Sequence, residues 1–466
     1  MSNSFQEVKN PYNQELIGKL PKPTKEEIEQ CFLSSKLAYD DYMKRMPAYE
    51  RAEILYKVAD LINTNYEELA RLIASEGGKP LKDAIVEVKR AVNTVKMSAM
   101  ETLNLNGEQI TMDRAKGSEN HWAFTIRQPI GPVLAISAFN HPVNLICHQV
   151  STAIAAGNSV ILKPAEKTPL SARKIVDYFY HSGLREDAIQ FLLLNGAETS
   201  QIISQDEIRY VSFIGNADIG WWIRKNVKPG VKVMLEHGGT AASVIAPDVV
   251  FSDVIPSLIR GAFYHSGQVC VSTQLVYVHS DIYDEFTQQL KDATSKLQTG
   301  DALSIHTDCG PLITSAVVEK MKFLVEDAVN KGAKVLLGGN CLPNQCFEPT
   351  LLENVNNNMV VFKDEVFGPI LSILKYTDIN DVIREINNSK FAFQTSIYTK
   401  DINLALYYAK NVEQKACIIN DSTAFRVDWM PFGGFKESGF GTGGIKYAIE
   451  DMTEEKLIVI KENYKS

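Results

Sequence analysis

"SVILKPAEKTPLSARKIVDYFYHSGL", residues 159–184, joins a short apolar run, a Pro-containing loop and a longer amphipathic segment. The apolar run is typical of a buried strand, and the segment after the loop is typical of a helix. Thr168 is suited to cap that helix, Pro169 to its first position, and Gly183 to its end. The same order recurs in "RYVSFIGNADIGWWIRK", residues 209–225. This alternation predicts a parallel sheet covered by helices.

Flanking segments extend the pattern. Thr24 and Glu27 form a capping-box pair at the start of a helix, and apolar spacing predicts another helix over Tyr49–Ser75. Residues 124–142, "FTIRQPIGPVLAISAFNHP", predict a strand, a Pro/Gly turn and a buried strand. The second half of the sequence also alternates between strands and helices, with strands expected at 241–247, 273–279 and 333–339 and helices at 251–266 and 315–330. The sequence therefore predicts two α/β domains joined around residues 236–241.

The composition is that of an ordinary globular protein. The 466 residues are 45% hydrophobic and 22% charged, with a net charge of −8. A negative chain without basic runs is a poor partner for nucleic acid. Apolar stretches such as 132–138 are far shorter than the roughly 20 residues that span a bilayer, so no membrane partner is expected.

Cysteines and histidines suggest neither disulfides nor a metal. The seven cysteines are an odd, scattered set, which argues against a disulfide framework. His306 with Cys309, and Cys341 with Cys346, are isolated pairs without a second matching pair. With an N-terminus that lacks signal-peptide order, these features predict a cytoplasmic protein without a bound metal.

Two residues have the setting of catalytic groups. Cys270 lies in "FYHSGQVCVSTQ", where a helix gives way to a Gly turn and a strand, so backbone N–H groups can surround a thiolate nucleophile. A buried, inert cysteine is the alternative. Glu236 lies in "VMLEHGGTAA", after an apolar strand and before two glycines, a setting for a mobile general base. A solvated glutamate at a strand end is the alternative.

Other polar residues follow predicted strands. Asn140 ends a buried strand, where its amide can donate to an oxyanion or simply form a turn. Lys163 and Glu166 follow the next strand, at the edge where open α/β sheets bind ligands and acids contact ribose, or form a solvated pair. Residues 215–220, "GNADIG", are not a G-x-G-x-x-G fingerprint, but a helix that begins there offers N–H groups to a phosphate.

Seven motifs together resemble the aldehyde dehydrogenase superfamily in order and spacing, from about Pro11 to Ile460. They are "FNHPVNL", "ILKPAEKTP", "FIGNADIG", "LEHGG", "GQVC", "DEVFGPIL" and "MPFGGFKESGFG". The resemblance implies NAD(P)-dependent oxidation of an aldehyde to a carboxylic acid. It also implies two Rossmann-like open-sheet α/β domains with a small β oligomerisation arm. The NAD-binding domain is expected at 1–112 and 132–237, the catalytic domain at 238–451, and the arm at 113–131 and 452–466.

The same resemblance implies roles for individual residues. Cys270 resembles the nucleophile, Glu236 the base that activates water, and Asn140 the side-chain donor to the oxyanion. The cofactor residues that the family implies are Lys163 and Glu166 at the adenosine ribose, Gly215, Asn216 and Gly220 at the pyrophosphate, and Glu365 and Phe367 at the nicotinamide. The chain departs from the family's usual pattern at Asn216, where a small hydroxyl residue is common, and at His141 and His237, where an aromatic residue or leucine is usual.

The substrate is less clear from the sequence. "STAFRVDWMPFGG" and "FNHP" resemble the branch that acts on short polar or anionic aldehydes such as lactaldehyde, phosphonoacetaldehyde or semialdehydes. Arg426 and His141 are then candidates to contact an anionic tail, although Arg426 suits a structural salt bridge equally well. Glu166 favours NAD because a 2′-phosphate would meet a like charge. Lys163 softens that repulsion, so use of NADP stays open.

Two alternatives accompany this interpretation. A CoA-acylating semialdehyde dehydrogenase or a phosphorylating relative would pass the thioester to another nucleophile, and retention of Glu236 argues against both. A non-catalytic, crystallin-like or scaffold protein would have lost Cys270, Glu236 and Asn140.

Self-association is also expected. "ENHWAFTIRQPIG", residues 119–131, and "EEKLIVIKEN", residues 454–463, indicate strands with exposed apolar edges that need covering. The family resemblance places both in an arm that joins a neighbour's sheet in a homodimer or homotetramer. A hairpin packed on its own domain is the alternative.

Overall fold

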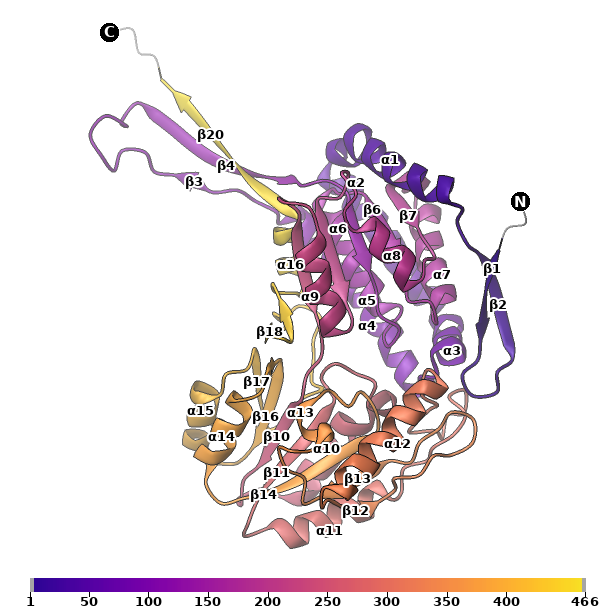
Figure 1. Ribbon diagram of the computed structural model, residues 1–466. Coiled ribbons are helices and arrows are strands. Elements are labelled where there is room, and N and C mark those ends of the chain that lie inside the picture. Colours follow the sequence, from indigo (N-terminus) through magenta and orange to yellow (C-terminus); the bar gives the residue numbers. More distant parts are fainter. Residues whose placement is uncertain (1–3, 463–466) are drawn as a thin grey trace.

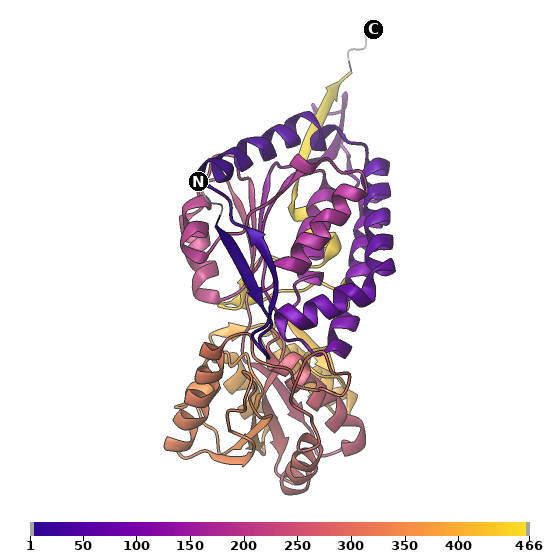
Figure 2. The same ribbon diagram turned by 90° about the vertical axis from the view of Figure 1, so that its right-hand side faces the viewer.

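The computed structural model describes residues 4–462, which form two lobes and a projecting arm (Figures 1 and 2). The first lobe is built on a six-stranded sheet in the order β19-β9-β8-β5-β6-β7. Its five parallel strands are β5 (Val133–Ile136), β6 (Val160–Lys163), β7 (Ile189–Phe191), β8 (Tyr210–Ile214) and β9 (Lys232–Glu236), and β19 (Gly439–Phe440) is antiparallel to β9. The chain order reverses between β5 and β8, which opens a crevice beyond their carboxyl ends.

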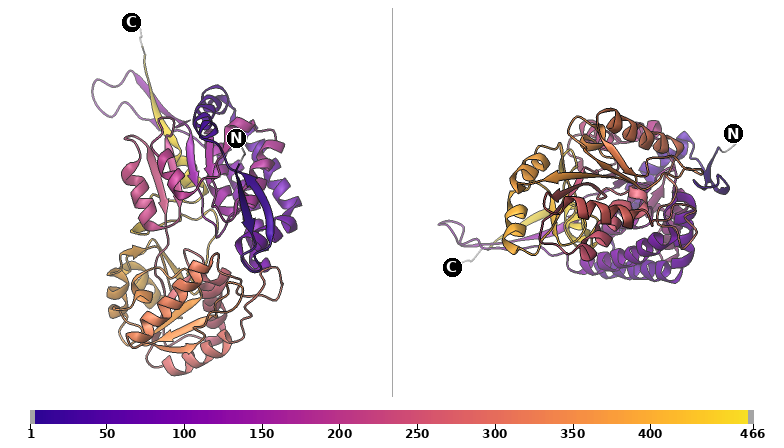
Figure 3. Two further views of the ribbon diagram at one scale, coloured as in Figure 1. Left: turned by 45° about the vertical axis from the view of Figure 1, so that its right-hand side comes forward. Right: turned by 90° about the horizontal axis from the view of Figure 1, so that it is seen from below.

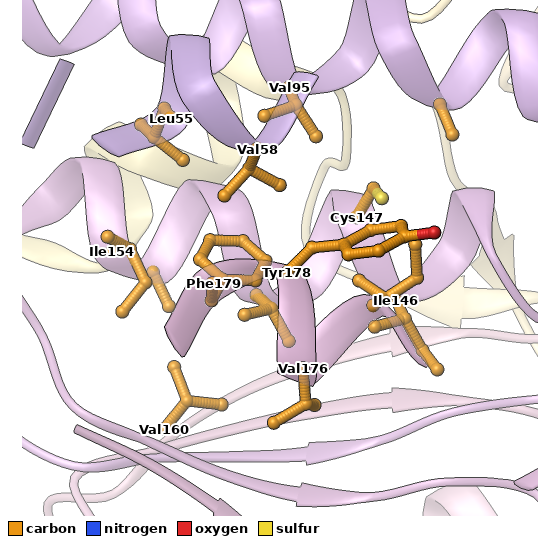
Figure 4. Packing of buried hydrophobic residues seen from close by; sticks show 14 of the residues in the cluster. Leu55, Val58, Val95, Ile146, Cys147, Ile154, Val160, Val176, Tyr178 and Phe179 are labelled. Carbon is orange, nitrogen blue, oxygen red and sulfur yellow. The ribbon is translucent and has the colours of Figure 1, made fainter. Parts of the chain in front are cut away.

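Helices cover both faces of this sheet because its strands are apolar on both sides. Val133 and Ala135 pack in one core cluster with helices α2 (Ala48–Thr64), α4 (Leu81–Leu103) and α7 (Pro169–His181), whose side chains interdigitate in Figure 4. Leu134 and Ile136 pack in a second cluster with α1 (Lys25–Asp41) and α9 (Ala217–Asn226). The remaining helices of this lobe are α3 (Tyr66–Gly77), α5 (Asn144–Ile146), α6 (Thr152–Ala156) and α8 (Gly196–Ile202).

Two local predictions in this lobe need correction. The helix expected over Tyr49–Ser75 is divided at Asn65, whose backbone leaves the helical range with φ −106° and ψ 23°. Both its backbone N–H and its side-chain Nδ2 donate to the carbonyl of Leu61. Thr168 stands at the N-cap position of α7 but makes no capping hydrogen bond. The buried carboxylate of Glu76 on α3 accepts the amides of Leu170 and Ser171 instead. A distant side chain thus replaces the local cap.

The second lobe has a seven-stranded sheet in the order β12-β13-β14-β11-β10-β16-β17. The strands are β10 (Ala241–Ile245), β11 (Thr273–His279), β12 (Lys334–Leu337), β13 (Thr350–Glu353), β14 (Ile370–Tyr376), β16 (Gln394–Tyr398) and β17 (Ala416–Ile419). Only the edge strand β12 among them is antiparallel. Its helices are α10 (Phe251–Phe263), α11 (Tyr283–Thr294), α12 (Ser315–Asn330), α13 (Val360–Lys363), α14 (Ile379–Asn387) and α15 (Ile402–Asn411). The predicted α/β class with two open sheets is confirmed.

The helix predicted over 251–266 ends at Phe263. Tyr264–Gly267 form a tight turn in which His265, Ser266 and Gly267 all have left-handed backbone, with φ of 48°, 55° and 71°. Two of these residues carry side chains, for which left-handed backbone is strained. This turn carries the chain from α10 to Cys270.

The arm consists of β4 (His121–Pro129), β20 (Thr453–Lys461) and the short β3 (Gln109–Ile110) (Figure 3). β4 and β20 pair antiparallel along their whole lengths. Before the arm, residues 439–451 return to the first lobe, where β19 pairs with β9 and α16 (Ile445–Asp451) contacts α4 and α6. The N-terminal hairpin consists of β1 (Phe5–Lys9) and β2 (Leu16–Pro21), and β15 (Phe391–Ala392) pairs with β18 (Phe435–Lys436). Residues 1–3 and 463–466 of the expected domain boundaries lie outside the described residues.

Candidate active site

A cavity of about 1110 Å³ receives residues from both lobes. The carboxyl ends of β5, β6, β8 and β9 form one wall, as the reversal of strand order requires. Eleven of the twelve predicted site residues line this cavity, namely Asn140, His141, Lys163, Glu166, Gly215, Asn216, Glu236, Cys270, Glu365, Phe367 and Arg426. The structure therefore brings together residues that are up to 286 positions apart in the chain.

Gly220 is the exception. It lies on α9 against the ring of His237, where an added Cβ would stand 1.9 Å from Nε2. His237 Nδ1 is 2.8 Å from the carbonyl oxygen of Glu437, and its ring packs between Phe213 and Trp221. Gly220 therefore allows α9 to pack closely against the end of β9, the strand that carries Glu236.

Cys270 and Glu236 face each other across the cavity. The thiol Sγ donates to Oε1 of Glu236 at 3.5 Å. Burial raises the pKa of Cys270, and the negative charge of Glu236 raises it further. Burial also raises the pKa of Glu236, against the charge of Arg426 and the hydrogen bond from Cys270. The geometry lets the carboxylate form of Glu236 take the proton of the Cys270 thiol.

Asn140 is placed beside the nucleophile turn. Its Nδ2 donates to the carbonyl oxygen of Gln268 at 3.0 Å, and an amide nitrogen has a second proton to give. The turn after Asn140 is held by Glu87 on α4, whose Oε1 accepts the amides of Val143 and Asn144 at 2.9 and 3.1 Å. Glu87 forms a buried ion pair with Lys79. Glu87 on α4, paired with Lys79 just before that helix, thus fixes the turn that carries the candidate oxyanion donor.

The first turn of α9 and the end of β6 form one end of the cavity. Asn216 caps α9, with Oδ1 accepting the amides of Asp218 and Ile219 at 2.9 and 3.4 Å. A serine or threonine side chain caps a helix in the same way. Asn216 therefore keeps the helix cap, although it differs from the residue that is common in the family. Burial lowers the pKa of Lys163, while the charge of Glu166 raises it.

Glu365 and Phe367 enter the cavity from the second lobe. Lys320 on α12 donates to the carbonyl oxygens of Glu365 and Val366, both at 3.0 Å, and so holds their backbone. Phe367 has a φ of 54° and makes an edge-to-face contact with Phe139. Burial raises the pKa of Glu365 to about 7, and its Oε1 has no hydrogen-bond partner among residues 4–462. This orphan acceptor can bind a hydroxyl group.

Beyond Cys270 the cavity is lined by basic side chains. Two of these side chains were predicted from the sequence. The Nε2 atom of His141 is 3.4 Å from the hydroxyl of Tyr264, and the guanidinium carbon of Arg426 is 3.5 Å from the centre of the Phe432 ring. Burial and the charges of nearby Lys79 and Arg90 hold the pKa of His141 well below its usual value, so its ring is neutral. We call the part of the cavity lined by Arg90, His141 and Arg426 the tail pocket.

The sequence did not predict Arg90 or its partner Asp428 as site residues. Arg90 Nε and Nη2 donate to the two carboxylate oxygens of Asp428 at 3.2 and 2.7 Å. A signal was present, because Asp83, Glu87 and Arg90 lie at helical spacing among apolar residues of 81–103. Charged residues on the apolar stripe of a helix call for buried partners.

No group of three metal-ligating side chains was found among the residues that the structure describes. Within the same residues, no helix has the length and apolar character that crossing a bilayer requires.

Comparison with known proteins places this site in a family. The model of the aldehyde dehydrogenase family matches residues 1–458. The chain belongs to the aldehyde dehydrogenase family. Its relatives include 3-sulfolactaldehyde dehydrogenase of Priestia megaterium, 40% identical over 97% of this chain and 94% of the relative. Lactaldehyde dehydrogenase of Methanocaldococcus jannaschii is 35% identical over 98% of this chain and 97% of that one. The predicted family and its lactaldehyde-like branch are thereby confirmed.

Solved aldehyde dehydrogenase structures share the fold. Aldehyde dehydrogenase 21 from Physcomitrella patens, in complex with the reaction product succinate, superposes with a TM-score of 0.96 and 34% identity, over 99% of this chain and 95% of that one. Glyceraldehyde-3-phosphate dehydrogenase of Methanocaldococcus jannaschii, complexed with NADP, gives a TM-score of 0.94 and 34% identity, over 99% and 100%.

Proposed function

We propose that this aldehyde dehydrogenase oxidises a short anionic aldehyde to its carboxylic acid with NAD. The observation that carries the proposal is the Cys270–Glu236 pair, 3.5 Å apart in the cavity beyond the carboxyl ends of the first sheet. Cys270 is the nucleophile, Glu236 the base and Asn140 an oxyanion donor.

Each proposed step uses Cys270, Glu236 or Asn140. Glu236 accepts the thiol proton as Cys270 attacks the aldehyde carbon. The developing oxyanion takes a hydrogen bond from Asn140, a contribution of about 3 kcal/mol for one such donor. Loss of a hydride from the tetrahedral adduct leaves a thioester on Cys270. After Glu236 has passed the thiol proton on to solvent, it deprotonates the water that hydrolyses this thioester.

The other end of the cavity fits a dinucleotide. The positive end of α9 can hold a pyrophosphate, and the orphan Oε1 of Glu365 can accept a ribose hydroxyl. A nicotinamide bound there supplies the acceptor for the hydride. Glu166 favours NAD, since a 2′-phosphate would meet its carboxylate at a cost of about 1–3 kcal/mol. A structural relative was solved in complex with NADP, so the choice of NAD for this chain rests on Glu166.

The tail pocket supports an anionic substrate. Arg426 has a buried Nε without a hydrogen-bond partner among the described residues, and a carboxylate or sulfonate could engage it. Relatives are named for 3-sulfolactaldehyde and aspartate semialdehyde, aldehydes that carry a sulfonate and a carboxylate group respectively.

The test is NAD reduction with paired charged and neutral aldehydes of equal length. A higher kcat/KM for the charged member and release of free acid are the expected results. Stimulation by CoA with formation of an acyl-CoA would instead support the CoA-acylating alternative. No reduction of NAD or NADP with any aldehyde would support a non-catalytic protein.

We also propose that the arm joins a second copy of this chain. Trp122, Phe124, Leu457 and Val459 are exposed on its strands, and apolar edges of this kind need a cover. Light scattering at micromolar concentration should give a dimer or tetramer, and a monomeric mass would contradict the proposal.

The seven free cysteines favour a cytoplasmic location.

A further inference from the structure

Two guanidinium groups line the tail pocket, but their surroundings differ. Arg426 makes no salt bridge among the residues that the structure describes. It stacks on the Phe432 ring, and the charges of Glu236, Arg90 and Asp428 act on it from a greater distance. Arg90 is engaged by both oxygens of Asp428. One cation is therefore available to a substrate and the other is already neutralised.

Asp428 is held as a carboxylate. It is 3% exposed and also meets His148 Nε2 at 2.9 Å and Asn144 Nδ2 at 3.2 Å. Burial alone would raise its pKa, but the hydrogen bond to His148 and the charge of Arg90 hold the pKa well below its usual range. Burial lowers the pKa of His148, so this ring adds little charge near neutral pH. The Arg90–Asp428 pair is thus a neutral unit.

The same carboxylate joins three walls of the cavity. Arg90 comes from α4, Asn144 begins α5 just after Asn140, and Asp428 is two residues beyond Arg426 in the loop after β17. Asn144 Oδ1 further accepts from the hydroxyl of Thr94 on α4. Asp428 therefore positions Arg90 and ties the loop that carries Arg426 to the turn that carries the oxyanion donor.

We infer that Asp428 restricts the enzyme to aldehydes whose tail carries one negative charge. This inference rests on the proposed anionic substrate, and it adds how many negative charges the tail of the aldehyde carries. With Arg90 neutralised, Arg426 alone balances the tail, which suits a carboxylate or sulfonate. A phosphate with two charges would leave one unbalanced in a largely buried pocket, where unpaired charge is costly.

The wild-type enzyme provides the first test. Succinate semialdehyde carries one charge from pH 6 to 8, whereas glyceraldehyde 3-phosphate gains its second near pH 6. Because the singly charged fraction of the phosphate rises from about 1% at pH 8 to about 50% at pH 6, the ratio of kcat/KM for the phosphate over the carboxylate substrate should rise about 50-fold over that range. Titration of Glu236 and Cys270 acts on both substrates and cancels in this ratio. A ratio independent of pH would overturn the inference.

Asp428→Asn provides the second test, because it keeps the shape and removes the charge. At pH 8 the same ratio should rise about tenfold, through KM rather than kcat, as Arg90 becomes available. The matched variant with both Arg90→Met and Asp428→Asn should show no such rise. An unchanged ratio in Asp428→Asn would overturn the inference, and if that variant does not fold, the wild-type pH series decides. Equal kcat/KM of wild type for butanal and succinate semialdehyde would instead overturn the proposed anionic substrate.

Discussion

Replacing Glu236 with glutamine removes the candidate base while keeping its shape. The carboxylate is 4% exposed and receives the hydrogen bond from Cys270 Sγ at 3.5 Å. A positioned general base contributes about 10²–10⁴-fold. Glu365, which also lines the cavity and has a pKa of about 7, leaves a second but less well placed base. We therefore expect steady-state turnover to fall roughly 100- to 1000-fold.

Rapid mixing with NAD and aldehyde separates the two steps in which Glu236 takes part. If the base acts mainly in thioester hydrolysis, Glu236→Gln should still form NADH in a burst of one per subunit, followed by slow turnover. Loss of burst and steady state together would mean that proton removal from Cys270 dominates. Unchanged steady-state turnover would refute the assignment of Glu236 altogether.

The pH profile gives an independent check. Because burial raises the pKa of Glu236, wild-type turnover should fall as the pH drops through that raised value, above the range of an ordinary carboxyl group. Glu236→Gln should lack this limb of the profile. Glu365→Gln is the matched control, since it should raise the KM for NAD and keep the acid limb.

Three further predictions concern other residues. Cys270→Ser should abolish dehydrogenation while NAD binding, followed by calorimetry, persists; turnover above a few per cent of wild type would contradict the nucleophile. Glu166→Gln should narrow the preference for NAD over NADP in kcat/KM, and equal efficiencies in the wild type would contradict the role of Glu166. Gly220→Ala should cost about 1–3 kcal/mol in unfolding free energy, because its Cβ would meet His237. Gly196→Ala, with open space at that position, should not destabilise, and equal Tm values for the two variants would refute the packing argument.

Local pattern predicted much of the fold. The helix Ser315–Asn330 and the strand Thr273–His279 have the predicted bounds, because periodicity and flanking turn residues act within a few positions. The same local reasoning failed where a side chain intervened. Asn65 interrupts a helix, and its side chain donates a hydrogen bond to the carbonyl of Leu61. Glu76, which is 94 residues before Leu170 in the chain, replaces the expected cap of α7.

The candidate site shows the same division. The motifs around Cys270, Glu236 and Asn140 were recognisable in the sequence because their backbone settings are local. That Sγ and Oε1 lie within hydrogen-bonding reach is decided by the packing of the two lobes, which places a strand end of one against a turn of the other. Arg90 and Asp428 are 338 positions apart, and the apolar stripe around Arg90 indicates that it needs a buried partner but not that Asp428 is that partner. Charge balance in a buried pocket depends on which distant groups pack together, so only the tertiary structure decides which arginine remains available to a substrate.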